Sequence, residues 1–242
     1  MKTYKIADVC FALESIFETV HDMYKDYVFS GEPEFVITTT QEDIEFEREK
    51  SRREREVEGL KLYDFKDEYL ETLAAYRKLA VKMTEYDTFL FHGSVIAVDG
   101  KAYLFTAKSG TGKSTHTRLW RELLGERAVM VNDDKPLLKV GEDCVTVFGT
   151  PYNGKHKLGC NMSAPLKAIC IIERGEQNSI EKISTSSAYD MLLQQAYRPS
   201  DGLALAKTLE LIDKACERLS LYRLKANMDI SAAELSFGTM SK

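Results

Sequence analysis

The stretch AKSGTGKST at residues 107–115 guides the interpretation of the whole chain. Glycines let backbone amides turn toward one anion, a lysine can reach the β and γ phosphates of a nucleotide, and a hydroxyl residue can hold magnesium. Gly110, Gly112, Lys113 and Ser114 supply these parts, so the stretch predicts a phosphate-binding loop (P-loop, Walker A). The candidate phosphate-binding residues are Ser109, Gly110, Thr111, Gly112, Lys113, Ser114 and Thr115.

One position departs from the usual GxxxxGK[ST] pattern. Ala107 stands where that pattern has its first glycine. Alanine is the smallest replacement, but it would be strained if the position required a positive φ. A strand before the loop and a helix after it would support the phosphate-binding interpretation.

The segments on both sides of the loop predict that arrangement. SVIAV and KAYLFTA are rich in β-forming residues and flank Asp99-Gly100, which suits a type I′ turn, so we expect a hairpin whose second strand enters the loop. STHTRLWRELLG predicts a short helix that ends at Gly125. Strands and helices alternate beyond it, which indicates an α/β fold, and the hairpin argues against a wholly parallel sheet.

Two adjacent acids end the predicted strand RAVMV. Asp133 and Asp134 follow Asn132 and come about 20 residues after Lys113. Carboxylates there can hold magnesium or accept a proton from an attacking hydroxyl, although two acids at a strand end can also cap a helix or form a turn. Because the glycine-rich loop precedes them, we favour the catalytic or metal role, with Ser114, Asp133 and Asp134 as candidate metal ligands.

Three further cationic or titratable residues are candidates. His92 precedes the hairpin, and it returns to the mouth of the loop only if the strand register allows, so a structural role is equally compatible with its position. Lys155 and His156 stand in GTPYNGKHKLG, whose Gly, Pro and Asn predict a loop. Clustered cations on a loop suit anion binding, and solvated surface residues are the alternative.

The chain is expected to divide near residue 88, into a small α+β region of unassigned role at 1–87 and a P-loop domain at 88–242. In the first region, YKIADVCFAL and YVFSGEPEFVIT predict strands, and YLETLAAYRKLAVKM predicts a helix. The charged run QEDIEFEREKSRREREVEG between them predicts a solvated helix or a mobile loop. Thr39 with Glu42 can form a capping box there, and Glu49 can pair with Arg53.

Composition excludes several classes of protein. The 242 residues are 44% hydrophobic and 29% charged, which is typical of a globular chain. The net charge of −5 offers no overall basic field for nucleic acid or anionic lipid, and no apolar run is long enough to span a bilayer. The five scattered cysteines indicate reduced thiols, most of them in or near the core, with neither a disulfide framework nor a zinc site. We therefore expect a soluble, cytoplasmic protein.

The pattern HGSVIAVDGKAYLFTAKSGTGKST followed by VNDD resembles the kinase domain of HPr kinase/phosphorylase and, more distantly, the core of ATP-dependent phosphoenolpyruvate carboxykinase. The resemblance covers roughly residues 88–184. It implies that Lys113 and the loop amides hold ATP phosphates and that Ser114 binds Mg²⁺, or Mn²⁺ in its place. In the HPr kinase pattern the acid matching Asp134 is the base toward an acceptor serine, whereas in the carboxykinase pattern it is a metal ligand, as is the histidine matching His92.

Together these features predict a mixed α/β, HPr-kinase-like enzyme that transfers the γ-phosphate of ATP to a hydroxyl, most plausibly a serine of a protein or peptide. The candidate catalytic residues are Asp134, Asp133, His92 and Lys113, and Lys155 or His156 would add a cation. The family resemblance is compatible with a homo-oligomer. The alternatives are a small-molecule P-loop kinase, a carboxykinase-like enzyme, and a regulatory module that binds the nucleotide without turnover.

Overall fold

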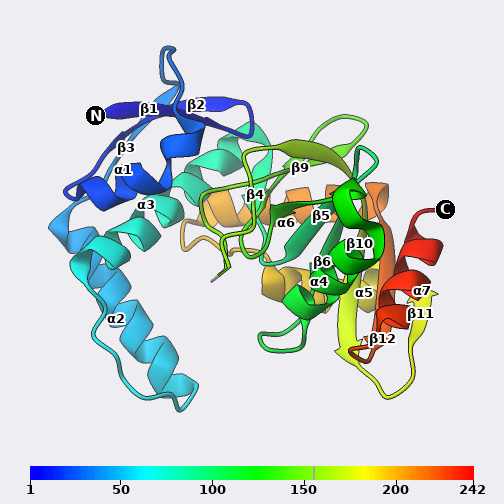
Figure 1. Cartoon of the computed structure of the whole chain (residues 1–242). Helices are drawn as coiled ribbons and strands as arrows, with labels where there is room; N and C mark the ends of the chain where they lie inside the picture. The colour runs from blue at the N-terminus through cyan, green and yellow to red at the C-terminus, as the bar shows by residue number, and fades with distance from the viewer. Residues whose placement is uncertain (155) are drawn as a thin grey trace. The chain divides into compact units, whose positions relative to one another are not determined.

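The computed structural model describes residues 1–154 and 156–242, and the chain divides into two units, Met1–Lys82 and Met83–Lys242 (Figure 1). The helices and strands of the first unit are β1 (Lys2–Ile6), β2 (Val9–Glu14), α1 (Glu18–Met23), β3 (Phe35–Thr38), α2 (Gln41–Val57) and α3 (Asp67–Met83), and the last of these ends at the boundary.

A three-stranded sheet in the order β1-β2-β3 forms the first unit's β layer. The segment interpreted as one strand from residue 4 is a hairpin, because Ala7 and Asp8 take φ values of 52° and 66° and reverse the chain. β3 pairs with β2 in parallel. The predicted strand YVFSGEPEFVIT is a strand only over Phe35–Thr38, since Gly31 and Pro33 interrupt its first part.

The charged segment forms the helix α2, not a mobile loop, and Arg53 pairs with Glu49 at 3.8 Å. The prediction of a capping box at Thr39 and Glu42 is wrong by one residue. The box is formed by Thr40, whose side chain accepts from the Asp43 amide, and by the Asp43 carboxylate, which accepts from the Thr40 amide. Thr39 is buried and its hydroxyl donates to Glu71 instead.

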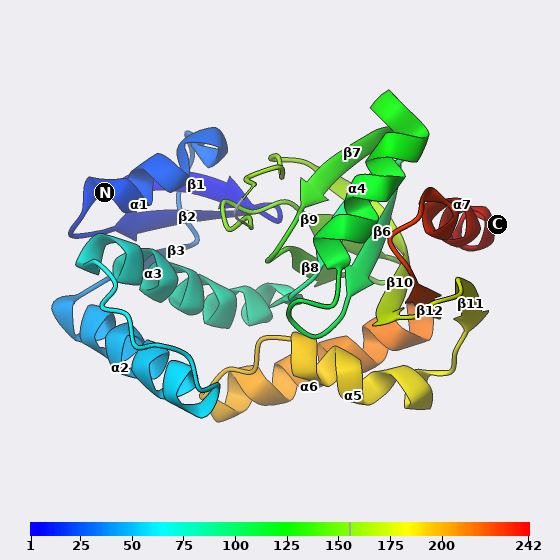
Figure 2. The ribbon, with the colours of Figure 1, turned by 60° about the horizontal axis from the view of Figure 1, so that its bottom comes forward.

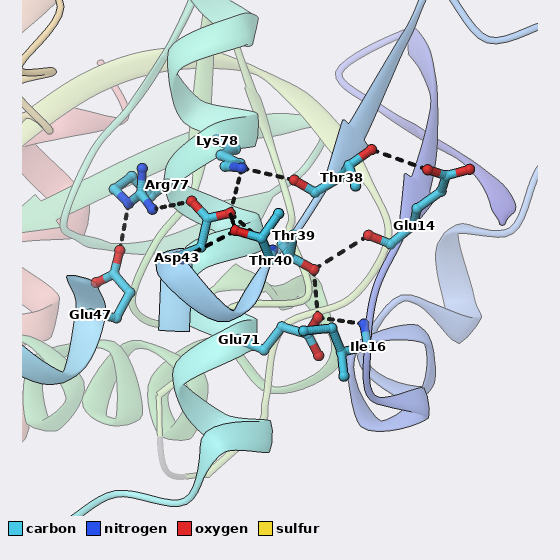
Figure 3. A network of polar contacts seen from close by, with 10 residues as sticks. All are labelled: Glu14, Ile16, Thr38, Thr39, Thr40, Asp43, Glu47, Glu71, Arg77 and Lys78. Carbon is cyan, nitrogen blue, oxygen red and sulfur yellow. Dashed lines mark hydrogen bonds and ion pairs between the residues drawn. The ribbon is translucent and has the colours of Figure 1, made fainter. Parts of the chain in front are cut away.

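Buried charges join α3 to its neighbours in the first unit, as Figure 3 shows. Glu71, which is fully buried, accepts hydrogen bonds from the amides of Ile16 (2.6 Å) and Phe17 (2.8 Å). Arg77 donates to Glu47 at 2.5 Å and to Asp43 at 3.0 Å. Every charge in this network has a partner within the first unit, so we assign the network a structural role.

A nine-stranded mixed sheet is the framework of the second unit. Its strands are β4 (Thr88–Leu90), β5 (Ser94–Val98), β6 (Lys101–Thr106), β7 (Ala128–Asn132), β8 (Leu137–Val140), β9 (Val145–Phe148), β10 (Ser163–Arg174), β11 (Ser179–Lys182) and β12 (Ser220–Ala226). The main path runs β4-β8-β9-β10-β6-β5-β7, while β12 pairs with β10 and β11. The mixed α/β prediction is confirmed.

The predicted hairpin is the antiparallel pair β5 and β6, and Asp99 and Gly100 take φ values of 51° and 77° at its turn. On its other side β6 pairs in parallel with β10. β10 changes partner along its length, pairing with β9 through Ser163–Pro165 and with β12 from Ala168 onward. The register shift between Leu166 and Ala168 lies where this exchange occurs.

Helices cover both faces of this sheet, as Figure 2 shows: α4 (Lys113–Leu124) and α7 (Ile230–Met240) on one, α5 (Thr185–Gln195) and α6 (Gly202–Arg218) on the other. Alternate residues of β5 belong to the two cores: Ile96 belongs to the cluster that includes Trp120 of α4, and Val95 belongs to the cluster that includes Leu211 of α6. This alternation is the two-residue period of a strand. Because both faces of β5 are covered, its sequence is a nearly continuous apolar run.

A buried serine connects α4 to α7. Ser236 Oγ accepts from Trp120 Nε1 at 2.8 Å, lies 3.0 Å from His116 Nε2, and donates to the Ala232 carbonyl at 2.8 Å. Since its one proton serves Ala232, Ser236 accepts from His116, which places the ring proton on Nε2. His116 Nδ1 is buried without a hydrogen-bond partner in the described structure. Protonation of His116 would therefore bury an unpaired N–H.

Acidification is expected to destabilise the second unit through His116. Burial lowers the pKa of His116 from 6.5 to about 4. The unfolded chain takes up this proton as the pH falls through 6.5, whereas the folded protein resists until about pH 4. Stability present above pH 6.5 is therefore lost toward pH 4, by about 3 kcal/mol. The free energy of unfolding, measured by urea denaturation at several pH values between 7 and 4, tests this loss.

The matched control is His116→Gln, which keeps an amide N–H and does not titrate. Its unfolding free energy should fall less steeply over the same pH range. Parallel curves for the wild type and His116→Gln would contradict the role of His116.

All five cysteines are free, and Cys10, Cys170 and Cys216 are buried, which confirms the expectation of mostly core thiols. Among the residues described, no helix is both long and apolar enough to cross a bilayer.

Candidate functional site

Three strands of the second unit end at the same edge of the sheet. β6 and β10 are parallel, and β7 runs the same way as β6 because both are antiparallel to β5 between them. Their carboxyl ends therefore present the glycine-rich loop, Arg174 and Asp133 at one edge, and β5 begins there just after His92. The carboxyl edge of such a sheet is where α/β proteins commonly bind ligands.

The glycine-rich loop (107–112) has the backbone that its sequence requires. Gly110 and Gly112 take φ values of 74° and 128°, where an L side chain would be strained, and no atom lies within 4 Å of a Cβ built on either. Ala107 is fully buried and is not among the residues with positive φ, so its replacement of glycine causes no backbone strain. The loop leads directly into α4, whose first turn contains no acidic residue.

Amides at the loop's end are free to bind an anion. In the described structure, the backbone N–H groups of Gly110, Gly112, Lys113 and Ser114 have no hydrogen-bond acceptor. They lie at the amino end of α4, where the helix dipole favours negative charge. Ser109 and Ser114 are exposed, while Thr111 and Thr115 are half-buried.

Lys113 lies inside the loop. Its side chain is mostly buried, and Nζ donates to the Ala107 carbonyl at 3.0 Å. Burial lowers the pKa of Lys113, and the nearby Asp134 carboxylate opposes that effect. Asp134 is thus close enough to interact electrostatically with the ammonium, and the structure brings these two predicted site residues together.

The two acids have different surroundings. Asp133 Oδ1 accepts from the Gly154 amide at 2.6 Å, and burial raises its pKa, although the hydrogen bond from Gly154 acts in the opposite direction. Asp134 is directed toward His92, with 3.4 Å between His92 Nε2 and Asp134 Oδ1. Burial raises the pKa of Asp134, but the hydrogen bond from His92 and the charges of Lys135 and Lys113 outweigh it, so its pKa is lowered.

Asn132 fixes the backbone that carries both acids. Its side-chain oxygen accepts from the amides of Asp134 (2.9 Å) and Lys135 (2.7 Å), and its Nδ2 donates to Thr150 Oγ1 (3.1 Å). Asn132 and Thr150 are completely buried. The rigid turn aims the two adjacent carboxylates at different partners.

Gln195, which the sequence analysis did not identify, orients His92. The distance between His92 Nδ1 and Gln195 Oε1 is 2.8 Å, and the His92 amide donates to the Gln195 carbonyl at 2.8 Å. Gly93 N in turn donates to the Asp134 carbonyl at 2.9 Å. The last residue of α5 is thereby joined to the segment that carries His92, and the ring is held between Gln195 and Asp134.

Removing the imidazole is expected to raise the pKa of Asp134. In His92→Ala, burial of the carboxylate would remain while its hydrogen-bond donor is lost. The carboxyl group should therefore titrate at a higher pH than in the wild type. Carbon-13 NMR titration without added metal measures this, with the Asp134 signal identified by its absence in Asp134→Asn.

Gln195→Ala should produce a smaller shift in the same direction, because it frees the ring without deleting it. An unchanged titration in His92→Ala would remove His92 from the electrostatic environment of Asp134.

The predicted cationic loop is only partly described. Lys155 lies outside the described residues. His156 is exposed, and its charge acts on Asp133, where it lowers the pKa against the larger effect of burial. The structure thus places His156 near Asp133 at this edge of the sheet.

Metal-binding side chains do not form a complete site by themselves. No group of three or more His, Cys, Asp or Glu in the described ranges could hold a metal ion. A cation here would need ligands beyond the carboxylates, and Mg²⁺ is usually bound by one or two carboxylates together with substrate phosphates and waters. The residue set fits that mode of binding.

Comparison with known proteins identifies the family. The family profile described as "SynChlorMet cassette protein ScmC" matches residues 61–223, about two thirds of the chain. The chain belongs to the ScmC family. No curated protein matches it. A solved structure of the HPr(Ser) kinase/phosphatase from Coxiella burnetii is similar with 10% sequence identity and a TM-score of 0.33, covering 62% of this chain and 94% of that one.

Proposed function

We propose that this protein is an ATP-dependent phosphotransferase that transfers the γ-phosphate to the hydroxyl of a serine in a protein or peptide. The observation that carries the proposal is the position of Asp134. An ionised carboxylate lies within electrostatic reach of Lys113, beside a loop whose free amides suit phosphate. Anion-binding groups next to a proton acceptor are what phosphoryl transfer to a hydroxyl requires.

The loop would hold the phosphates of ATP. The amides of Gly110, Gly112 and Lys113 would donate to phosphate oxygens, and the Lys113 ammonium would exchange its bond to the Ala107 carbonyl for the β and γ phosphates. Ser114 would hold Mg²⁺ together with phosphate oxygens and water, and the ion neutralises charge on the transferred group when bound. No protein atom lies within 4 Å of a Cβ built on either glycine, so side chains do not block a phosphate there.

Asp134 would act as the base. As the acceptor oxygen bonds to the γ-phosphorus, its proton passes to the Asp134 carboxylate and the bond to the ADP oxygen breaks. The contact with His92 keeps the carboxylate ionised before the reaction, and Gln195 keeps the ring in place. Asp133, bound to Gly154, would position the loop around His156 rather than take the proton.

The test is phosphorylation of a lysate of the source cell with γ-labelled ATP and Mg²⁺. The wild type should label a protein band that Asp134→Asn does not. ATP consumption without a labelled band would replace the protein acceptor with a small molecule. Binding of ATP without consumption would overturn the proposal in favour of a regulatory module.

A further inference from the structure

Arg174 contacts the glycine-rich loop through backbone carbonyl groups of the loop. It is the last residue of β10, and its Nη2 donates to the Gly110 carbonyl at 2.6 Å. Its Nε lies 3.4 Å from the Thr111 carbonyl and donates to it. One guanidinium thus holds two consecutive carbonyls.

Holding these carbonyls also sets the direction of the amides. In a planar trans peptide the C=O and the following N–H point in opposite directions. When Arg174 holds the Thr111 carbonyl, the Gly112 N–H points away from Arg174, and that amide has no acceptor in the described structure. The Gly110 carbonyl likewise directs the Thr111 N–H away from Arg174, and this N–H donates to the Lys108 carbonyl at 3.2 Å.

Besides the two bonds from Arg174, these two peptides have one hydrogen bond in the described structure, from the Thr111 amide to the Lys108 carbonyl at 3.2 Å. Gly110 and Gly112 have positive φ and no atoms around a built Cβ, so side-chain packing does not restrain them. Because glycine adopts a wide range of φ and ψ values, the two peptides would rotate easily if Arg174 released their carbonyls. The rigid fork of an arginine can donate to two acceptors at fixed spacing, which the point charge of a lysine cannot do.

We propose that Arg174 is a positioning residue that pre-orients the glycine-rich loop for phosphate. The phosphate ligand rests on the proposed function, whereas the ordering of the loop does not. Arg174 acts through the loop backbone and stays on its carbonyl side. Its loss should weaken binding of every nucleotide that places a phosphate in the loop, by a similar factor.

The first experiment needs no nucleotide. Backbone ¹⁵N order parameters of Gly110, Thr111 and Gly112 should fall in Arg174→Ala from rigid values of about 0.85 toward about 0.6 or below. Arg118→Ala is the matched control, because Arg118 is an exposed arginine of α4 that pairs with Glu122 and not with the loop. Unchanged order parameters in Arg174→Ala would overturn the proposal.

The second experiment measures the dissociation constants of ADP and ATP by calorimetry. Arg174→Ala should raise both about tenfold, with Arg174→Lys between it and the wild type and Arg118→Ala near the wild type. A much larger loss for ATP than for ADP would show direct contact with the γ-phosphate and overturn the positioning role. If the wild type binds neither nucleotide, the proposed function fails, and the order parameters alone decide the role of Arg174.

Discussion

Asp134→Asn is expected to reduce phosphoryl transfer by about 10² to 10⁴-fold while the protein still binds ATP. The amide has the shape of the carboxylate but cannot accept the proton of the acceptor hydroxyl. The turn that carries it should persist, because Asn132 holds the backbone amide of residue 134, not its side chain. Single-turnover transfer and calorimetric ATP binding measure the two effects separately.

Asp133→Asn is the control for this variant. The Asp133 side chain accepts from the Gly154 amide, and the oxygen of an asparagine can do the same. We therefore expect a smaller loss of transfer. Full transfer by Asp134→Asn would exclude Asp134 as the base, and equal losses in both variants would contradict the division of roles between the two acids.

Lys113→Ala is expected to abolish detectable transfer. The buried ammonium is the cation nearest to the bound phosphates in the proposed complex, and the loss of one such electrostatic contact typically costs about 10² to 10³-fold in rate. The variant also loses the hydrogen bond that holds the Ala107 carbonyl. Transfer to the labelled acceptor measures the effect.

Lys108→Ala provides the comparison, because Lys108 is an exposed lysine of the same loop. It should keep most of the activity. Transfer by Lys113→Ala at the rate of Lys108→Ala would exclude Lys113 from the phosphate site.

Local sequence signals predicted the elements around the loop. Asp99-Gly100 specified the hairpin, the predicted helix after the loop is α4, and Gly125 ends it with a φ of 58°. Each of these features depends on residues within a few positions of one another. The strands β4, β8 and β12 and the helices α1 and α7 were missed, since they are short or lack a clear apolar period.

The capping box shows where local patterns become ambiguous. Three consecutive threonines begin at Thr38, and both Thr39 and Thr40 have an acid three residues later. The spacing therefore allows either threonine to form the capping box. Tertiary structure decides between them, because the Thr39 hydroxyl donates a hydrogen bond to Glu71 of α3, and Thr40 caps α2.

The partners of the candidate site residues could not be predicted for a related reason. His92 meets Gln195 across 103 positions of sequence, and Arg174 meets Gly110 across 64. Glutamines and arginines are usually solvated, and neither belongs to the glycine-rich pattern. The pairing of β10 with β6 brings Arg174 to this edge, and the bridge between Phe91 and Ala196, the residue after α5, brings Gln195 there.

The serine contact between α4 and α7 has a consequence for synthesis. Trp120 and His116 share Ser236 Oγ as hydrogen-bond partner, and Ser236 is synthesised 116 and 120 residues after them. Until then Trp120 can make its ring contacts with Tyr103 and Phe105, which precede it, but lacks Ser236 and Phe237 of α7. The contacts between α4 and α7 can therefore form only after residues 230–240 have been synthesised, and such non-local contacts are the slower ones to form in folding.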